Sequence, residues 1–385
     1  MTNDSLTASK IVMTIMVRDE VDIIDSMITH HLGQGVDKFI VTDNGSTDGT
    51  TEVLQGYADT GVVDLRHDPV HRKQQSVTVT QMARDAFTLY GADWVLNADA
   101  DEFWVAQDHN LTLRDAFSHI PKTLRSFVVP VIDMTGAPAE SGSGIERLLY
   151  RDTRPEEQLR SIGLRAHSTH DSVHIGVADI NVAQGNHYVS ISSAGSPDPA
   201  FALEVYHLPW RSWDQFRHKV ENAGRAYEAN PELTPSPNHH GMRDYRSLKD
   251  GTLRARYIAR SLSTAEIEQA ESGVHPYLTP DHRLRSALVS SVPDTSFDGD
   301  TETYERTVGL SLARLDLAEN AVGDLRKQLT AKEERMVQLE SSLVDSREEI
   351  AGLKAETRQL QAMVEAFKSR RLIRFADSVK NRLSR

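Results

Sequence analysis

Short apolar runs alternate with amphipathic segments through the first hundred residues, and this alternation restricts the fold more than any other feature. The apolar runs have the length of strands and occupy residues 11–17, 38–42, 62–65 and 94–98. Between them, apolar side chains recur at helical spacing within residues 20–32, 51–57 and 79–90. Strands that alternate with helices form mostly parallel sheets with right-handed crossovers. We therefore predict an α/β fold with a Rossmann-type, mostly parallel sheet flanked by helices.

The pattern is less regular after residue 126. Strands are predicted at residues 127–132 and 177–182, and a loop of small residues is predicted between them at residues 136–144. A helix is predicted at residues 213–228. The polar segment 291–305 has little apolar periodicity and is predicted to be a linker. The globular domain is accordingly predicted to span residues 1–290.

One heptad register runs from residue 306 to residue 367. Eight of its nine a positions are apolar, namely Val308, Leu315, Val322, Leu329, Met336, Leu343, Ile350 and Val364. Six of its nine d positions are apolar, namely Ala318, Leu325, Leu339, Leu353, Leu360 and Phe367. Because sustained heptads are typical of coiled coils, we predict a coiled coil that makes the protein a homodimer. The alternative is a single amphipathic helix packed on the globular domain.

The last segment, residues 368–385, has a net charge of +6 in a chain of net charge −13. Apolar residues interleave with its basic residues at roughly helical spacing. This composition is typical of a basic amphipathic helix that lies on an anionic membrane surface. A solvated tail and an RNA-binding arm are the alternatives.

The chain has no cysteine, and its acidic residues outnumber its basic residues by 56 to 43. The lack of thiols excludes disulfide scaffolds, thiolate zinc sites and cysteine nucleophiles, so a metal must be bound by Asp, Glu, His or carbonyl groups. The acidic balance argues against a nucleic-acid partner. Residues 1–10 are polar and the apolar run after them is too short for a secretory signal, which predicts a cytoplasmic protein. Membrane contact should be peripheral, because no apolar run approaches the 18 or so residues that span a bilayer.

An acidic turn follows the second predicted strand. Neither of the two common glycine-rich nucleotide loops occurs, which argues against dinucleotide oxidoreductases and P-loop NTPases. Residues 42–50 instead read Thr-Asp-Asn-Gly-Ser-Thr-Asp-Gly-Thr at the carboxyl edge of the sheet, where ligands of such folds bind. Asp43 and Asn44 can accept hydrogen bonds from a base, and Ser46 or Asp48 can cap the following helix. A capped turn without a ligand is the alternative.

Two aspartates follow the fourth predicted strand, in the sequence Asp99-Ala100-Asp101. Side chains two residues apart on an extended segment point to the same side, with backbones about 7 Å apart. Both carboxylates can therefore bind one divalent cation, which would act as a Lewis acid on a departing diphosphate. A solvated loop is the alternative for the pair alone, but the acidic turn on the neighbouring strand favours a metal site.

These motifs resemble those of the family 2 glycosyltransferases of GT-A fold. Residues 43–50 are similar to that family's Asp-Asp-Gly-Ser-x-Asp-x-Thr, and residues 99–103 are similar to the Asp-x-Asp-Glu-Phe of one branch. That branch opens with Asn-Glu, here Asp19-Glu20. It also carries His-(x)3-Arg-Ser-(x)3-Phe-(x)2-Lys, matched by His207, Arg211, Ser212, Phe216 and Lys219. The resemblance covers about residues 11–227 and leaves out the predicted coiled coil.

The resemblance implies a nucleotide-diphospho-sugar donor. Asp43 and Asn44 would lie near its base, and basic side chains would suit its diphosphate. The implied donor-binding residues are Glu20, Asp43, Asn44, Ser46, Arg211 and Lys219.

The resemblance also implies that Asp99 and Asp101 bind Mn²⁺ or Mg²⁺. His207 would complete the ligands, His187 is a rival for that role, and a core histidine is the alternative at either position. An inverting transferase needs a carboxylate base to deprotonate the acceptor hydroxyl, and the sequence departs from the family pattern here because no clear Glu-Asp pair follows the metal motif. The candidates are Glu204, Asp171 and Asp133. Glu204 is favoured because it closely precedes His207.

Together these features predict a metal-dependent glycosyltransferase in the cytoplasm, peripheral to the inner face of the membrane. Such a placement suits an envelope glycan or a lipid-linked acceptor. A nucleotidyl or phosphoryl transferase shares acidic metal sites and is one alternative, and a non-catalytic coiled-coil scaffold is the other. Paired Asp99 and Asp101 argue against the scaffold.

Overall fold

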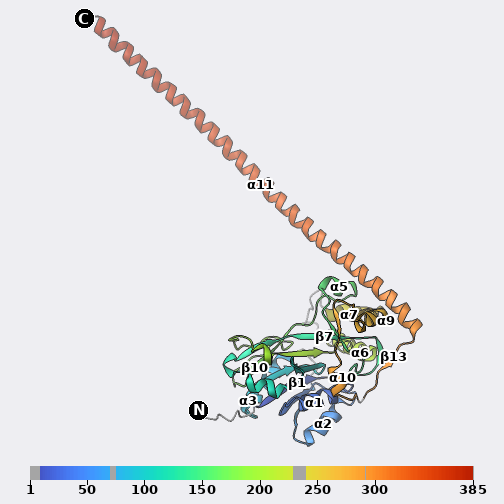
Figure 1. Ribbon diagram of the computed structural model, residues 1–385. Helices are drawn as coiled ribbons and strands as arrows, with labels where there is room; N and C mark the ends of the chain where they lie inside the picture. Colours follow the sequence, from blue (N-terminus) through green and yellow to red (C-terminus); the bar gives the residue numbers. More distant parts are fainter. Residues whose placement is uncertain (1–8, 70–74, 229–239, 291, 385) are drawn as a thin grey trace, which may run out of the picture. The chain divides into compact units, whose positions relative to one another are not determined.

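The structure is a computed structural model that describes residues 9–69, 75–228, 240–290 and 292–384 (Figure 1). The polar N-terminal residues 1–8, residue 291 of the predicted linker and residue 385 of the basic tail lie outside the described residues. The chain divides into two compact units, one ending at Asp316 and the other beginning at Leu317.

The first unit is built on a sheet of six strands in the order β3-β2-β1-β4-β10-β6. Four neighbouring strands are parallel: β1 (Ile11–Val17), β2 (Lys38–Asp43), β3 (Val63–His67) and β4 (Trp94–Ala98). They are joined by α1 (Ile24–Gly33), α2 (Thr50–Asp59) and α3 (Gln75–Thr88). Two further strands, β10 (Asp171–Ile175) and β6 (Ser126–Val129), extend the sheet in antiparallel pairing. The predicted α/β fold is confirmed.

β1 is apolar except at Thr14, because helices cover both faces of the sheet. The Thr14 hydroxyl donates to Asn97 Oδ1 of β4 (2.7 Å). Met13 and Ile15 point into a core that includes Met27 of α1. Val12, on the opposite face, packs in a second core with Met82 of α3. A strand buried on both faces cannot alternate apolar and polar residues, and this explains the almost continuous apolar run in the sequence.

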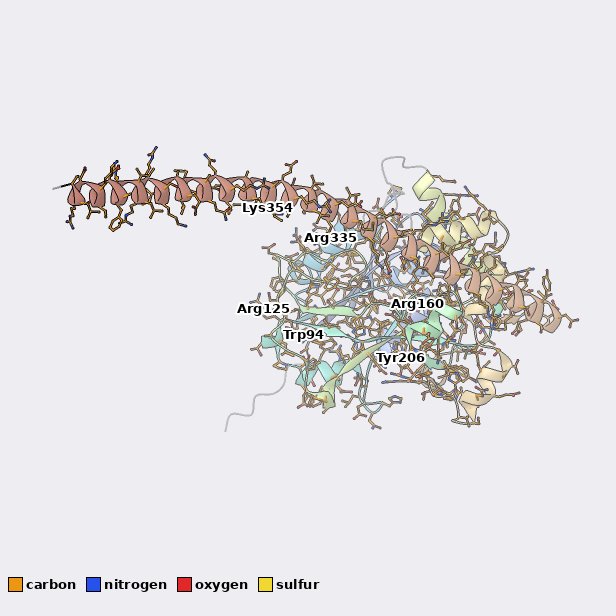
Figure 2. All side chains as sticks on the ribbon, turned by 90° about the horizontal axis from the view of Figure 1, so that it is seen from above. Trp94, Arg125, Arg160, Tyr206, Arg335 and Lys354 are labelled. Atoms are coloured by element: carbon orange, nitrogen blue, oxygen red, sulfur yellow. The ribbon has the colours of Figure 1, made fainter. Side chains whose placement is uncertain are left out.

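A second sheet of five strands, in the order β12-β9-β7-β11-β5, continues from the first. Its strands are β5 (Glu102–Ala106), β7 (Val131–Thr135), β9 (Tyr150–Asp152), β11 (Leu203–His207) and β12 (Leu278–Pro280). The chain passes from the first sheet to the second between β4 and β5. Figure 2 labels Trp94 of the first sheet and Tyr206 of the second, both of which are fully buried.

Three local predictions are wrong. The predicted strand 127–132 is two strands in different sheets, β6 and β7, because Pro130 between them has no N–H to donate to a ladder. The predicted strand 177–182 has only an isolated bridge at Val182. The backbone of Val182 is satisfied by α3 instead, since its N–H donates to Thr80 Oγ1 (2.9 Å) and its carbonyl accepts from Ser76 Oγ (2.7 Å). The predicted loop 136–144 contains β8 (Ala139–Ser141), which pairs with β13 (Thr295–Ser296).

Helices complete the first unit. They are α4 (Leu113–His119), α5 (Glu156–Ser161), α6 (Trp213–Glu228), α7 (His240–Lys249), α8 (Leu253–Arg260), α9 (Thr264–Glu271) and α10 (Arg283–Ala287). The prediction of a helix at 213–228 is confirmed by α6. None of the helices in the described part of the chain combines the length and the apolar character needed to cross a bilayer.

The last helix, α11 (Gly299–Leu383), is a single unbroken helix of 85 residues (Figure 1). It begins inside the segment predicted as linker. Its first turns pack on the first unit, where Arg256 Nη1 lies 2.5 Å from Asp316 Oδ2 and Gly309 lies against the backbone of Ala255. A Cβ on Gly309 would lie 2.0 Å from the Ala255 carbonyl oxygen, so only glycine permits this contact.

Candidate active site

A pocket of about 300 Å³ lies where the carboxyl ends of β1 and β4 meet α6. Ligands of open α/β sheets bind at this edge because the loops that follow the strands converge there. Five residues predicted from the sequence line the pocket: Glu20, Asn44, Asp99, Asp101 and Lys219. The structure therefore brings together positions up to about two hundred residues apart in the chain.

Asp99 and Asp101 lie in the turn between β4 and β5, where the chain leaves one sheet and enters the other. The N–H of Asp99 donates to Glu102 Oε2 (3.0 Å), which closes the turn. The N–H of Leu208, just after β11, donates to the Asp101 carbonyl (2.9 Å). The two aspartates are thus fixed by both sheets.

Asp101 is almost fully buried and faces three cationic groups. Its Oδ2 lies 3.1 Å from Lys219 Nζ, 3.2 Å from Arg211 Nη1 and 3.8 Å from His207 Nε2. Burial alone would raise the pKa of Asp101, but the charges of these three groups hold it well below its usual range. Asp101 is therefore a carboxylate at any physiological pH.

Asp99 has a different electrostatic environment. Burial and the neighbouring charge of Asp101 raise the pKa of Asp99 to about 6. Its Oδ1 accepts hydrogen bonds from the side-chain amides of Gln75 and Asn186, both at 3.2 Å. Asp99 therefore carries an unfavourable negative charge at neutral pH, and this charge would be stabilised by a cation.

His207, at the end of β11, is oriented by a carboxylate behind it. Its Nδ1 lies 2.9 Å from Asp133 Oδ1, which leaves Nε2 facing Asp101. Burial opposes the charged imidazole, but the Asp133 hydrogen bond and the Asp101 charge raise the pKa of His207. The rival candidate His187 is held by Asp171, with 3.0 Å between His187 Nδ1 and Asp171 Oδ1.

The donor chemistry of Asp99, Asp101 and His207 fits a hard divalent cation. Mutually repelling carboxylates and an imidazole anchored through its far nitrogen are common features of metal sites. Within the described ranges, no three Asp, Glu or His side chains are arranged to hold an ion by themselves.

Arg211 links this turn to the loop that follows β1. It is fully buried, and its guanidinium contacts Glu20, Asp22 at 2.8 Å from Nε, and Asp101. Burial raises the pKa of Glu20 to about 7 although Arg211 and Lys219 oppose the shift. Glu20 and Arg211 therefore form one buried network with the predicted metal site.

In the acidic turn 43–50, some side chains hold the backbone of the turn and another lines the pocket. Asp43 accepts hydrogen bonds from the N–H (2.9 Å) and the hydroxyl (2.7 Å) of Ser46, and from the Thr51 hydroxyl. Ser46 Oγ in turn accepts from the N–H of Asp19 (3.0 Å). Asp43 and Ser46 thus hold the turn, while Asn44 lines the pocket.

Sequence reasoning missed three residues that join the β1 loop to α6. Asp19 adopts a left-handed backbone conformation with φ of 54°. Its carboxylate accepts from the Thr47 N–H (2.7 Å), from His218 Nε2 (3.1 Å) and from Asn222 Nδ2 (3.0 Å). The spacing of His218 and Asn222, four residues apart beside Lys219, is the sequence signal that marks this inward face of α6.

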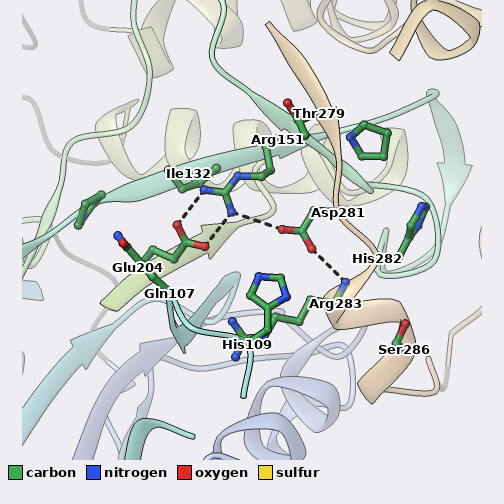
Figure 3. A pocket seen from close by; sticks show the side chains of 12 residues that line it. Gln107, His109, Ile132, Arg151, Glu204, Thr279, Asp281, His282, Arg283 and Ser286 are labelled. Atoms are coloured by element: carbon green, nitrogen blue, oxygen red, sulfur yellow. Dashed lines mark hydrogen bonds and ion pairs between the residues drawn. The ribbon is translucent and has the colours of Figure 1, made fainter. Parts of the chain in front are cut away.

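Glu204 lies in a different cavity, shown in Figure 3. This cavity has a volume of about 910 Å³ and lies among β7, β9, β11 and β12. Arg151 donates from Nη1 and Nη2 to the two Glu204 oxygens at 2.7 and 2.8 Å, and Nη1 lies 3.3 Å from Asp281 (Figure 3). Glu204 and His207 are three residues apart on one strand, so their side chains point to opposite faces.

The two other candidate bases are both engaged. The carboxylate of Asp133 accepts from His167, Ser168 and His207, and despite burial these hydrogen bonds hold the pKa of Asp133 well below its usual range. Asp171 is fully buried and contacts His187. Asp133 is a positioning group for His207.

Residues 12–127 match the family model for glycosyltransferase family 92. The matched segment includes β1 to β4, the acidic turn and the Asp99-Ala100-Asp101 turn. This segment, under a third of the chain, is similar to the glycosyltransferase family 92 domain, and the structure that contains it is an α/β fold with a long C-terminal helix. The narrower resemblance to family 2 stays a prediction.

Two solved structures are similar to the chain at low sequence identity. The structure of S. aureus TarS 1–349 in complex with UDP is 12% identical, with coverage of 82% of this chain and 92% of that chain and a TM-score of 0.32. Glucosyl-3-phosphoglycerate synthase from Mycobacterium tuberculosis in complex with phosphoglyceric acid is 17% identical, with coverage of 43% and 57% and a TM-score of 0.25. The comparison with curated proteins gave no match.

Proposed function

We propose that the protein transfers a sugar from a nucleotide-diphospho-sugar with the help of a divalent metal ion. The observation that carries this proposal is the placement of Asp99, Asp101 and Lys219 in one pocket at the carboxyl edge of the sheet, with Arg211 buried behind Asp101. Carboxylates recruit a cation, and the adjacent Lys219 ammonium group suits the anionic diphosphate, while the buried Arg211 holds Asp101 in place. A donor with a diphosphate needs both kinds of group in one pocket.

Different residues of the pocket would bind the nucleoside and the diphosphate of the donor. Asn44, at the end of β2, and Asp19, after β1, lie at the part of the pocket that would accept the nucleoside. Lys219 stays charged because the Asp101 carboxylate raises its pKa above the usual value, so it remains a cation for the diphosphate. The α6 face that carries Lys219 also carries His218, which is tied to Asp19.

Asp99, Asp101 and His207 would hold Mn²⁺ or Mg²⁺. When bound, the ion would supply Lewis-acid neutralisation of the leaving diphosphate. Asp133 keeps the His207 ring in the orientation that points Nε2 toward Asp101. We propose no catalytic role for Glu204, since Arg151 neutralises it in a separate cavity.

A thermal-shift screen tests donor and metal binding. We expect one nucleoside diphosphate to raise the melting temperature of the full-length protein in the presence of Mn²⁺, and to raise it much less with EDTA, because a ligand that binds only the folded state stabilises it. At a ligand concentration of about 100 Kd, this stabilisation is about 2.7 kcal/mol. Equal shifts with and without the metal would contradict the assigned role of Asp99 and Asp101.

We further propose that the acceptor is an envelope glycan or a lipid-linked glycan at the cytoplasmic face of the membrane. The support is the basic tail, which is helical up to Leu383 and carries the exposed apolar side chains Leu372, Phe375, Val379 and Leu383. An exposed apolar stripe on a basic helix favours the interface of an anionic bilayer. This placement would bring the active site to membrane-bound acceptors.

The tail proposal predicts weaker vesicle binding in a charge variant. Replacing Arg370 and Arg371 together with glutamine should weaken binding to anionic vesicles about 30-fold, because each basic residue near such a surface contributes about 1 kcal/mol. Vesicle co-sedimentation at low and high salt measures the effect. The matched control replaces Lys327 and Arg358, which are exposed elsewhere on α11, and should leave binding unchanged. Unaltered binding by the Arg370/Arg371 variant would count against membrane docking by the tail.

A further inference from the structure

The second unit exposes a long apolar stripe along α11. Leu329, Leu339 and Ile350 are 58%, 54% and 51% exposed, and other apolar a and d side chains of the unit are exposed to similar extents. An isolated helix in water gains little from such a stripe, because most helical stability in proteins comes from packing of the apolar face. The stripe therefore needs a partner of similar length.

The globular domain is not that partner for the first turns of α11. Glu305, ahead of the seam, pairs with Arg254 of the domain. Within the heptad register, the residues that pack on the domain include Arg306, Gly309, Ala313 and Asp316. These are heptad positions f, b, f and b, on the side of the helix away from a and d. The contact that anchors α11 to the first unit thus leaves the apolar seam free.

We propose that residues 308–367 form a parallel, in-register, two-stranded coiled coil with a second copy of this chain. This adds orientation and register to the homodimer predicted from the heptads, and it does not depend on the proposed reaction. Leucine at four of the d positions, with Val322, Ile350 and Val364 among the a positions, favours two strands.

The charges beside the seam fit this arrangement. In a parallel dimer a residue at g faces the residue at e of the next heptad on the partner. The facing charged pairs are Arg314 with the partner's Glu319, Arg335 with the partner's Glu340, and Glu349 with the partner's Lys354. All three pairs are of opposite sign, each occurs twice in the dimer, and no pair of like charge arises among the g and e positions between residues 308 and 367. Within the seam, Lys332 at d faces the partner's Lys332, which costs stability but is compatible with a two-stranded coil. Arg335 and Lys354 are labelled on α11 in Figure 2.

Other registers bring like charges together. A slip of one heptad places Arg314 opposite the partner's Arg326, and Arg335 opposite the partner's Arg347, on one side of the seam. The other side keeps three attractive pairs, Arg335 with the partner's Glu333, Glu349 with the partner's Arg347 and Glu356 with the partner's Lys354, against six attractive pairs in the unslipped dimer. The like-charge pairs are destabilising, so the slipped register is disfavoured.

The antiparallel arrangement with full overlap is disfavoured for the same reason. It places Glu340 opposite the partner's Glu340, and Arg326 opposite the partner's Lys354. The pairing of Glu333 with the partner's Arg347 is its only favourable charged contact across the seam. The charge pattern therefore selects the parallel, in-register dimer.

The seam ends where the basic tail begins. After Phe367, the next a and d positions are Arg371 and Arg374, which would repel their counterparts in the partner. The apolar residues of the tail, including Ala376, Val379 and Leu383, lie on a different face of the helix. In a parallel dimer both tails start at the same end, so two basic, amphipathic segments can reach one surface together.

Single-cysteine variants test the orientation, and the chain suits this experiment because it has no cysteine of its own. Under mild oxidation, full-length Leu353→Cys should become a disulfide-linked dimer, since d faces d in a parallel pair. Glu348→Cys, at the outward f position, is the matched control and should stay largely unlinked. A differently tagged mixture of Leu325→Cys and Ile350→Cys should give no linked heterodimer, because those positions face each other only in the antiparallel pair.

Charge reversal tests the register. Glu340→Arg should raise the dimer Kd about tenfold in sedimentation equilibrium, because two attractive pairs become repulsive. Adding Arg335→Glu to the same chain should restore the original Kd, since the pair is then reversed as a whole. A monomer at all concentrations, a trimer or tetramer, a linked Leu325→Cys/Ile350→Cys heterodimer, or no rescue by the second substitution would overturn the proposal.

Discussion

Asp99→Asn should reduce sugar transfer by about 10²–10³-fold while the protein keeps its fold, because loss of one such electrostatic group commonly has this cost. Its effect on stability has a definite sign. The pKa of Asp99 is raised from 3.8 to about 6 in the folded protein, so the folded state binds the proton more tightly than the unfolded chain. The charge of Asp99 therefore lowers stability as the pH rises from about 4 to about 6.

The asparagine variant removes this destabilising charge. Above pH 6 its melting temperature without metal should equal or exceed that of the parent, and below pH 4 the two should be the same. Mn²⁺ should stabilise the parent more than the variant. The control Asp108→Asn alters an exposed carboxylate outside the pocket and should leave transfer and metal response unchanged. A fully active Asp99→Asn enzyme would contradict the metal-site assignment.

Arg211→Gln should be among the most destabilising single substitutions in the first unit. Arg211 is fully buried between Glu20, Asp22 and Asp101, and its loss would leave these carboxylates without their shared cation. Removing one partner of a buried ion network typically costs about 3–5 kcal/mol. Urea unfolding of the variant measures the loss, which should appear as a lower midpoint.

The control for this substitution is Arg217→Gln, which changes an arginine nearby in the sequence, on α6. Arg217 is 45% exposed by side chain and pairs only loosely with Glu221, at 3.9 Å. Surface substitutions of this kind usually change stability by less than about 0.5 kcal/mol. Equal effects of the two substitutions would show that the network around Arg211 does not hold the active site together.

The parallel part of the first sheet was predictable because each strand is centred on a short, mostly apolar run between helical patterns. The runs that became β1 and β4 end at the residues observed, since burial on both faces favours apolar side chains. The two polar exceptions, Thr14 and Asn97, satisfy each other by a hydrogen bond. The second sheet was not predictable, because β7, β9, β11 and β12 pair residues far apart in the chain and no local pattern states their partners. The apolar run around Pro130 belongs to two strands in different sheets, β6 before the proline and β7 after it. The apolar character of the run does not show that the chain changes sheet there.

The site was predictable where a motif limits the chemistry. Asp99 and Asp101 follow a buried strand, while Arg211 and Lys219 were found only through the motif resemblance. Asp43 and Ser46 show the limit of this reasoning, because a short oxygen-bearing side chain can serve a turn as well as a ligand. The misplacement of Glu204 could have been avoided from the sequence. Glu204 and His207 are three residues apart on a strand, and this spacing implies that their side chains point to opposite faces.

Measurement of the nucleotide product tests the central proposal most directly. Purified full-length protein would be incubated with uridine, guanosine, adenosine and thymidine diphospho-sugars, with Mn²⁺ or with EDTA, and the nucleotide released would be identified. The account predicts that one donor class yields a nucleoside diphosphate, that EDTA stops its release, and that Asp99→Asn slows it by about 10²–10³-fold. Release of a nucleoside monophosphate or of pyrophosphate, or release that is unaffected by EDTA and by Asp99→Asn, would contradict it.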